Sequence, residues 1–367
     1  MEEKEALVIF RRLCYIGQLK MILKFERKLI VKKLVSFLLL GALLLSGCAA
    51  KAEPKDPNKL QIVATVFPAY DFARAAAGEY AEVTLLLPPG AESHSYEPTP
   101  ADILAVRDCD LFLYLGGDSD AWVDTILTSV EPTGHAMRMV DCVELLEEEH
   151  VEGMQLEPGH THEDGEECHD EHHDHDHQEE HEEADTGLGR VTGYDEHVWT
   201  SPKNAAAITR SIGAELAELD PNHREQYLAA AESYAGEIEQ VDTELTAYFD
   251  SLTDRTIVFG DRFPLRYFAE QYELDYFAAF PGCSTQTEPS AATIAFLVDK
   301  VEREEIPAVW YIEFSNHLVA DSIAEATDTK TAMFHTCHNV SRAEMDSGVT
   351  YVSLMEQNLE TLRDNLT

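Results

Sequence analysis

The chain has 367 residues, more than one hydrophobic core usually supports, so we expect two domains. Its 69 acidic side chains outnumber the 27 basic ones and give a formal net charge of -42. Such a surface repels nucleic acid and anionic lipid and attracts cations, so the composition argues against DNA or RNA as partners.

The N-terminal part has the features of an exported lipoprotein. Basic residues between Lys24 and Lys33 precede an apolar run at 34–45, which is short for a membrane span and typical of a signal peptide. The run ends in Leu45-Ser46-Gly47-Cys48, which resembles the bacterial lipobox, the motif whose cysteine is lipidated and becomes the first mature residue.

We therefore expect residues 1–47 to be a signal peptide, with Met21 as an alternative start. Cys48 is the expected lipidation site, and the polar, proline-containing stretch 48–59 is the expected tether. The protein would then be extracytoplasmic and anchored by lipid to the bacterial cell membrane.

Two series of short apolar strands alternate with helical segments, a pattern typical of parallel sheets covered on both faces. In residues 60–143, the N-terminal lobe, we predict strands at 61–67, 82–87, 111–115 and 136–140. In residues 254–367, the C-terminal lobe, we predict strands at 256–259, 275–280, 308–313 and 332–335. The predicted fold is α/β, with two lobes that each hold a four-stranded parallel sheet with flanking helices.

Residues 203–253 are predicted to form the helices between the lobes. The second of these starts at Asp220-Pro221, a helix-capping residue followed by a first-turn proline, and runs to about residue 252. At 1.5 Å per residue it would be roughly 45 Å long. A long, rigid linking helix predicts small closing motions between the lobes.

The stretch 144–185 contains nineteen Asp and Glu residues, nine His and no Lys or Arg. It has no apolar period and cannot bury a core, so we expect a disordered loop. Its histidines and carboxylates can bind divalent cations weakly at many points. A solvated spacer is the alternative interpretation.

Candidate ligand histidines fall where the carboxyl ends of the predicted strands meet, the usual position of ligands in parallel α/β sheets. His94 lies in the loop that follows the second strand, and His197 lies in the segment 186–202, just before the linking helices. His335 and His338 follow the last strand. Imidazoles that converge from distant parts of the chain suit an ion of the zinc class.

Several motifs together resemble the zinc- or manganese-binding lipoproteins of ABC transporters, the cluster A-I solute-binding proteins. They are the lipobox, the loop Gly-Ala-Glu-Ser-His-Ser-Tyr-Glu-Pro-Thr-Pro, the segment Asp-Glu-His-Val-Trp-Thr-Ser-Pro behind an acidic histidine-rich insertion, and the long linking helix. The resemblance covers nearly all of the mature chain. It implies that His94 and His197 are metal ligands.

The second lobe departs from the pattern of that family. Gly260 and Asp261 stand where the family usually has His or Glu, and His335 stands where it usually has Asp or Glu. Asp261 is a candidate oxygen ligand or a partner of Arg262, and His338 is the alternative to His335. Glu313 is a candidate acceptor for a hydrogen bond from a ligand histidine.

The resemblance implies a binding protein, not an enzyme, that captures Zn(II) and delivers it as a monomer to an ABC permease with its ATPase. The alternatives are a manganese-binding homologue, a surface zinc store or adhesin that uses the histidine-rich loop, and a zinc hydrolase with Asp261 or Glu313 as base. Whether Cys283 and Cys337, which each follow a predicted strand, form a disulfide stays open.

Overall fold

The computed structural model describes residues 56, 58–93, 96–117, 120–130, 134–154, 193–282, 284 and 288–366. The chain divides into two units, Met1–Asp56 and Pro57–Thr367, and both lobes belong to the second unit. The predicted features that lie outside the described residues include the signal peptide, the lipidation site Cys48, the candidate ligand His94 and the candidate disulfide cysteine Cys283. Within the described ranges, none of the helices has both the length and the apolar character needed to cross a membrane.

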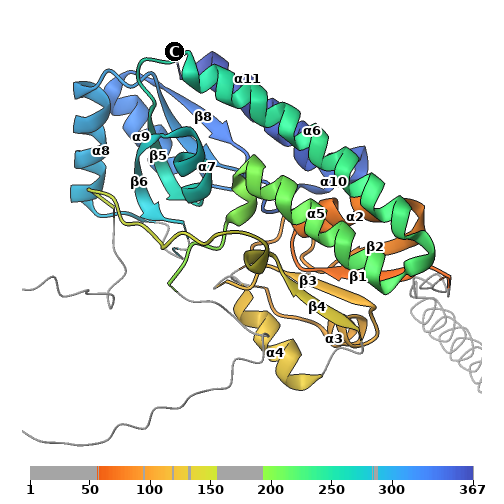
Figure 1. The fold of residues 1–367 in the computed structure, drawn as a ribbon. Helices are drawn as coiled ribbons and strands as arrows, with labels where there is room; N and C mark the ends of the chain where they lie inside the picture. Colours follow the sequence, from red (N-terminus) through yellow and green to blue (C-terminus); the bar gives the residue numbers. More distant parts are fainter. Residues whose placement is uncertain are drawn as a thin grey trace, which may run out of the picture. The chain divides into compact units, whose positions relative to one another are not determined.

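The first lobe is a four-stranded parallel sheet in the order β2-β1-β3-β4 (Figure 1). Successive side chains of β1 point to opposite faces of the sheet, and both faces are buried. Ile62 and Ala64 pack in one hydrophobic cluster, and Val63 packs in another. Helix α2 covers the first face, and α3 and α4 cover the second. The strands are β1 (Leu60–Ala64), β2 (Ala81–Leu85), β3 (Leu111–Tyr114) and β4 (His135–Arg138), and the helices are α2 (Phe67–Ala77), α3 (Pro100–Arg107) and α4 (Ala121–Ser129).

The second lobe repeats this plan with the strand order β6-β5-β7-β8, so the predicted pair of four-stranded parallel sheets is confirmed. Helices α8 and α9 cover the face that carries Val258 and Val309, and α7 and α11 cover the face that carries Phe259 and Phe334. The strands are β5 (Thr256–Phe263), β6 (Asp275–Pro281), β7 (Ala308–Ile312) and β8 (Lys330–Phe334). The helices are α7 (Arg266–Tyr272), α8 (Ala291–Arg303), α9 (Leu318–Thr327), α10 (Arg342–Ser347) and α11 (Tyr351–Asn365).

Strand β5 is longer than the sequence predicts, because it continues past Phe259 through an irregular register to Phe263. Gly260 lies inside the strand, and a Cβ atom at this position would stand 2.4 Å from the Cα of Ala320 in α9. Only glycine lets the strand and the helix approach this closely. Asp261 and Arg262 therefore belong to a sheet strand and not to a loop.

Two helices lie between the lobes in sequence, α5 (Pro202–Leu219) and α6 (Arg224–Asp250). The 27 residues of α6 correspond to a length of about 40 Å. Figure 1 shows α6 running beside α11, and α6 also packs against α2 and α5. Helix α6 thus contacts helices of both lobes, and one hydrophobic cluster includes residues from each.

The first part of the predicted loop 144–185 lies against the second lobe. The N–H of Leu146 donates to the hydroxyl of Tyr267 over 3.1 Å, and the hydroxyl of Tyr276 donates to Glu149 over 2.9 Å. Residues 155–192 are outside the described part of the chain.

Asp71 joins three helices at one buried point. Its side chain is 1% exposed and lies on α2. It accepts hydrogen bonds from the hydroxyl of Tyr234 on α6 and from the N–H of Tyr351, the first residue of α11. Arg74 donates to its second oxygen over 2.7 Å. This carboxylate therefore connects the first lobe with the long helix and with the second lobe.

We predict that Asp71→Ala lowers the free energy of unfolding by about 2–4 kcal/mol, because a buried hydroxyl and a buried N–H lose their acceptor. Chemical denaturation measures the change. Asp299→Ala is the matched control, since Asp299 forms an exposed pair with Arg303 and its loss should cost less than about 0.5 kcal/mol. Equal effects of the two substitutions would contradict the role of Asp71.

A second buried carboxylate, Asp120, holds the end of β3. It accepts hydrogen bonds from the N–H of Leu115 over 2.6 Å and from the N–H of Gly116 over 3.0 Å. Burial raises the pKa of Asp120 to about 7, and the negative charge of Glu196 adds to the rise, although the backbone hydrogen bonds lower it.

The raised pKa of Asp120 predicts a pH-dependent stability. Between pH 3.8, the ordinary pKa, and about pH 7, the folded state binds the proton of Asp120 more tightly than the unfolded chain does. The stabilisation of the folded state by this proton is therefore complete below about pH 4 and is lost as the pH rises to 7. Asp120→Asn keeps an acceptor oxygen and cannot ionise. The free energy of unfolding of this variant minus that of the unsubstituted protein should rise by about a few kcal/mol between pH 4 and pH 8, the energy that corresponds to the pKa shift. A pH-independent difference in denaturation experiments would refute this assignment.

Candidate metal site

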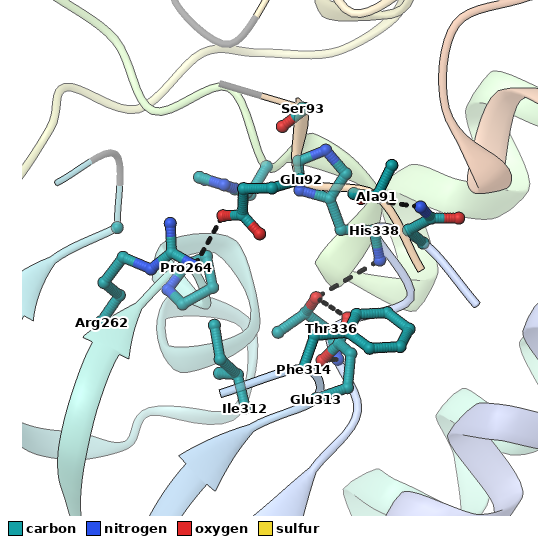
Figure 2. Close-up of a pocket in the computed structure, with 13 residues that line it drawn as sticks. Ala91, Glu92, Ser93, Arg262, Pro264, Ile312, Glu313, Phe314, Thr336 and His338 are labelled. Carbon is teal, nitrogen blue, oxygen red and sulfur yellow. Dashed lines mark hydrogen bonds and ion pairs between the residues drawn. The ribbon is translucent and has the colours of Figure 1, made fainter. Parts of the chain in front are cut away.

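A cavity of about 30 Å³ lies where loops of both lobes meet, and it is large enough for one water-sized group (Figure 2). The loop after β2 supplies Glu92 and its neighbours, and β5 supplies Arg262. Glu313 and His338 follow β7 and β8. These positions are at the carboxyl ends of parallel strands, where ligands of α/β proteins usually bind.

His197 enters the cavity from the segment before α5. It caps the short 3-10 turn Val198–Thr200, and its side chain is 2% exposed. The ring Nδ1 lies 3.1 Å from Oδ1 of Asp195, which also accepts the backbone N–H of His197 over 2.8 Å. Because a carboxylate only accepts hydrogen bonds, Nδ1 carries the proton and Nε2 keeps its lone pair. A carboxylate behind an imidazole is the usual arrangement at metal-binding histidines.

Burial and the neighbouring charges have opposite effects on the pKa of His197. Burial lowers its pKa, but the charge and hydrogen bond of Asp195 and the charge of Glu196 outweigh burial, so the pKa is raised. The same negative charges favour a metal cation at this imidazole. A proton therefore competes with the metal for His197, and acid weakens metal binding.

His338 also lines the cavity. Its ring centroid lies 6.1 Å from that of His197 and 5.3 Å from that of Trp199. The preceding residue, Cys337, has a left-handed φ of 63°, which turns the chain sharply after β8. The carbonyl of His338 accepts the N–H of Phe67 over 3.2 Å, so this part of the second lobe is fixed to the first lobe.

His335, the other lobe-two histidine, is buried but is not among the residues that line the cavity. Its Nδ1 accepts the N–H of Cys337 over 3.0 Å. Its Nε2 is buried, has no hydrogen-bond partner within the described part of the chain, and stands 3.8 Å from Glu344. The amide of Asn358 pairs with both backbone groups of His335. The structure thus brings His338, and not His335, to His197.

Asp261 is not among the cavity-lining residues either. Its oxygens accept the backbone N–H of Arg262 over 2.8 Å and that of Ile312 over 3.4 Å. The side chain of Arg262 pairs instead with Glu92, at 2.8 Å (Figure 2). Arg262 and Glu92 are cavity residues that the sequence pattern did not single out, although Glu92 stands two positions before His94.

Glu313 lines the cavity and holds the turn that leads to His338. Its two oxygens accept the N–H of Thr336 over 2.7 Å and the hydroxyl of Thr336 over 2.6 Å. Nδ1 of His335 lies 3.8 Å away, too far for a hydrogen bond. Glu313 therefore supports the loop that leads to His338.

The donors in the cavity fit a borderline cation such as Zn(II), for which neutral imidazoles are preferred ligands. Among the described residues, which leave out His94, no group of three or more His, Cys, Asp or Glu side chains is gathered closely enough to hold an ion. Cys337 is a buried, free thiol, and burial raises its pKa well above the ordinary value. The thiol is therefore neutral at physiological pH, and the expected partner, Cys283, lies outside the described residues.

Several solved structures share this fold. The Zn(II)-bound ZnuA-like domain of Streptococcus pneumoniae AdcA aligns with a TM-score of 0.64 at 24% identity, covering 84% of this chain and 99% of that domain. A Mn-bound periplasmic metal-binding protein from Candidatus Liberibacter asiaticus aligns with a TM-score of 0.65 at 17% identity, covering 83% and 99%. At these identities the likeness establishes the two-lobed architecture alone.

The comparison of sequences identifies the family as well as the fold. The high-affinity zinc uptake system protein ZnuA of Bacillus subtilis is 30% identical over 340 residues, which cover 90% of this chain and 94% of that protein. The family model described as "Zinc-uptake complex component A periplasmic" matches residues 62–365, which include both lobes and the cavity between them. The chain therefore belongs to the ZnuA family of zinc-uptake components.

Proposed function

We propose that this protein captures Zn(II) outside the cytoplasm, in the cavity between its lobes, and delivers it to an ABC permease with its ATPase. The observation that carries the proposal is the meeting of His197 and His338 in one cavity, with Asp195 holding His197 in the tautomer that leaves Nε2 available. The ZnuA family consists of transport components, so a zinc hydrolase is set aside.

In this proposal the ligands are His94, His197 and His338. His338 is preferred to His335 because it lines the cavity, while His335 is held apart by Cys337 and Asn358. Asp261 is left out because its oxygens face backbone N–H groups. An imidazole-rich set favours zinc over manganese, which prefers oxygen ligands. We further propose that the protein is a monomer anchored by a lipid at Cys48.

We predict that His197→Ala and His338→Ala each weaken zinc affinity by more than about 100-fold, beyond the loss typical of a residue that only supports a ligand. His335→Ala should weaken it less than about tenfold. His135→Ala is the matched control, because His135 pairs with Glu215 on the surface, away from the cavity. Competition titration against a chromophoric chelator gives the affinities. A larger loss for His335→Ala than for His338→Ala would reverse the ligand assignment.

Removal of residues 155–185 separates the site from the histidine-rich segment, while it keeps the contacts of Leu146 and Glu149 with the second lobe. We predict that one tight zinc ion per chain remains and that only weaker, additional binding is lost, since scattered histidines and carboxylates bind ions without a fixed geometry. Isothermal titration counts the sites. Loss of the tight site would favour the zinc-store function instead.

A further inference from the structure

An ion pair between residues that line the cavity joins the second lobe to a loop of the first lobe. Nη2 of Arg262, on β5 of the second lobe, lies 2.8 Å from Oε1 of Glu92, on the loop after β2 of the first lobe. Both side chains line the cavity, and Figure 2 shows the carboxylate directed toward the guanidinium. Arg262 also donates to the carbonyl of Ser284 over 3.5 Å, which holds its position on the second lobe.

We propose that the Glu92–Arg262 ion pair is a latch that must open before zinc enters or leaves the cavity. The inference rests on the proposed function of the same site. It assigns to Arg262 a positioning role that is distinct from metal ligation, since a guanidinium has no lone pair to offer to a metal.

The base of the Glu92 loop is fixed separately, by neutral contacts. Asn339 donates from Nδ2 to the carbonyls of Pro88 and Ala91, each over 2.8 Å, and the N–H of Gly90 donates to Val340 over 2.9 Å. Asn339 is buried, so these contacts persist without salt dependence. Glu92 can therefore leave Arg262 while the base of the loop stays on the second lobe.

The ion pair itself faces water. The Glu92 side chain is 46% exposed and that of Arg262 is 20% exposed, so solvent and salt weaken the contact. A partly exposed pair opens more easily than buried hydrogen bonds. The exposure places the Glu92–Arg262 contact among the weaker links between the lobes, which is the property that a latch needs.

The charges of Glu92 and Arg262 also affect how well the cavity retains a zinc cation. Arg262 and His197 line the same cavity, so the positive charge of the guanidinium opposes a divalent ion there. Glu92 offsets this repulsion while the two side chains are paired. The contact itself needs both side chains, so loss of either partner should weaken the retention of zinc, and loss of both should do no further harm.

The test is a double-mutant cycle with Glu92→Gln and Arg262→Gln, in which stopped-flow transfer of zinc to a chelator gives the release rate. Each single variant should release zinc about two- to fivefold faster than the unsubstituted protein, the range expected for a partly exposed pair. The double variant should match the single variants rather than multiply their effects. Added salt should accelerate release from the unsubstituted protein and leave Arg262→Gln unchanged.

Arg210→Gln is the matched control, because Arg210 pairs with Glu232 on the surface, outside the cavity. It should leave zinc release unchanged. Multiplicative effects in the double variant, or release from Arg262→Gln that is no faster than normal, would overturn the latch. Slower release would mean that the guanidinium mainly repels the ion. Failure of the unsubstituted protein to bind zinc would instead contradict the proposed function, and the latch would fall with it.

Discussion

The hydrogen bond between Asp195 and His197 is the interaction on which the proposed zinc site depends. Both side chains are buried, and the carboxylate accepts from the ring and from the backbone of the same histidine. An imidazole held in this way has one orientation and one tautomer, so its Nε2 lone pair is ready before a metal arrives. The loop itself is anchored because the hydroxyl of Tyr267, on the second lobe, donates to the carbonyl of Asp195 over 2.7 Å.

Neutral hydrogen bonds around Trp199 bring the second imidazole to the first. The indole of Trp199 donates to the carbonyl of Thr336 over 2.9 Å, and the hydroxyl of Tyr351 donates to the carbonyl of Trp199 over 2.8 Å. Thr336 is in turn held by the carboxylate of Glu313, so this link differs from the two neutral ones. Buried neutral contacts avoid the large desolvation cost of buried charges, so they suit a permanent framework. The partly exposed pair of Glu92 and Arg262 is one of the weaker contacts, which solvent and salt weaken further.

Much of this architecture could be predicted from the sequence, because all eight strands correspond to short apolar runs between helical segments. The candidate ligand His197 could be predicted because it lies in a distinctive polar segment. The choice between His335 and His338 could not be predicted. It depends on the left-handed backbone at Cys337, after which His338, and not His335, lines the cavity. The place of Arg262 in the cavity was not predicted, because β5 continues through Gly260 and the close packing of Gly260 against Ala320 is visible only in three dimensions.

The central claim is that one zinc ion is bound by imidazoles from both sides of this cavity. A crystal structure of the zinc-loaded protein, with anomalous diffraction at the zinc edge, tests it most directly. We predict one strong peak in the cavity, with Nε2 of His197 and a nitrogen of His338 at zinc–nitrogen distances of about 2.0–2.1 Å. A fully occupied zinc ion elsewhere, with His197 uncoordinated, would contradict the claim.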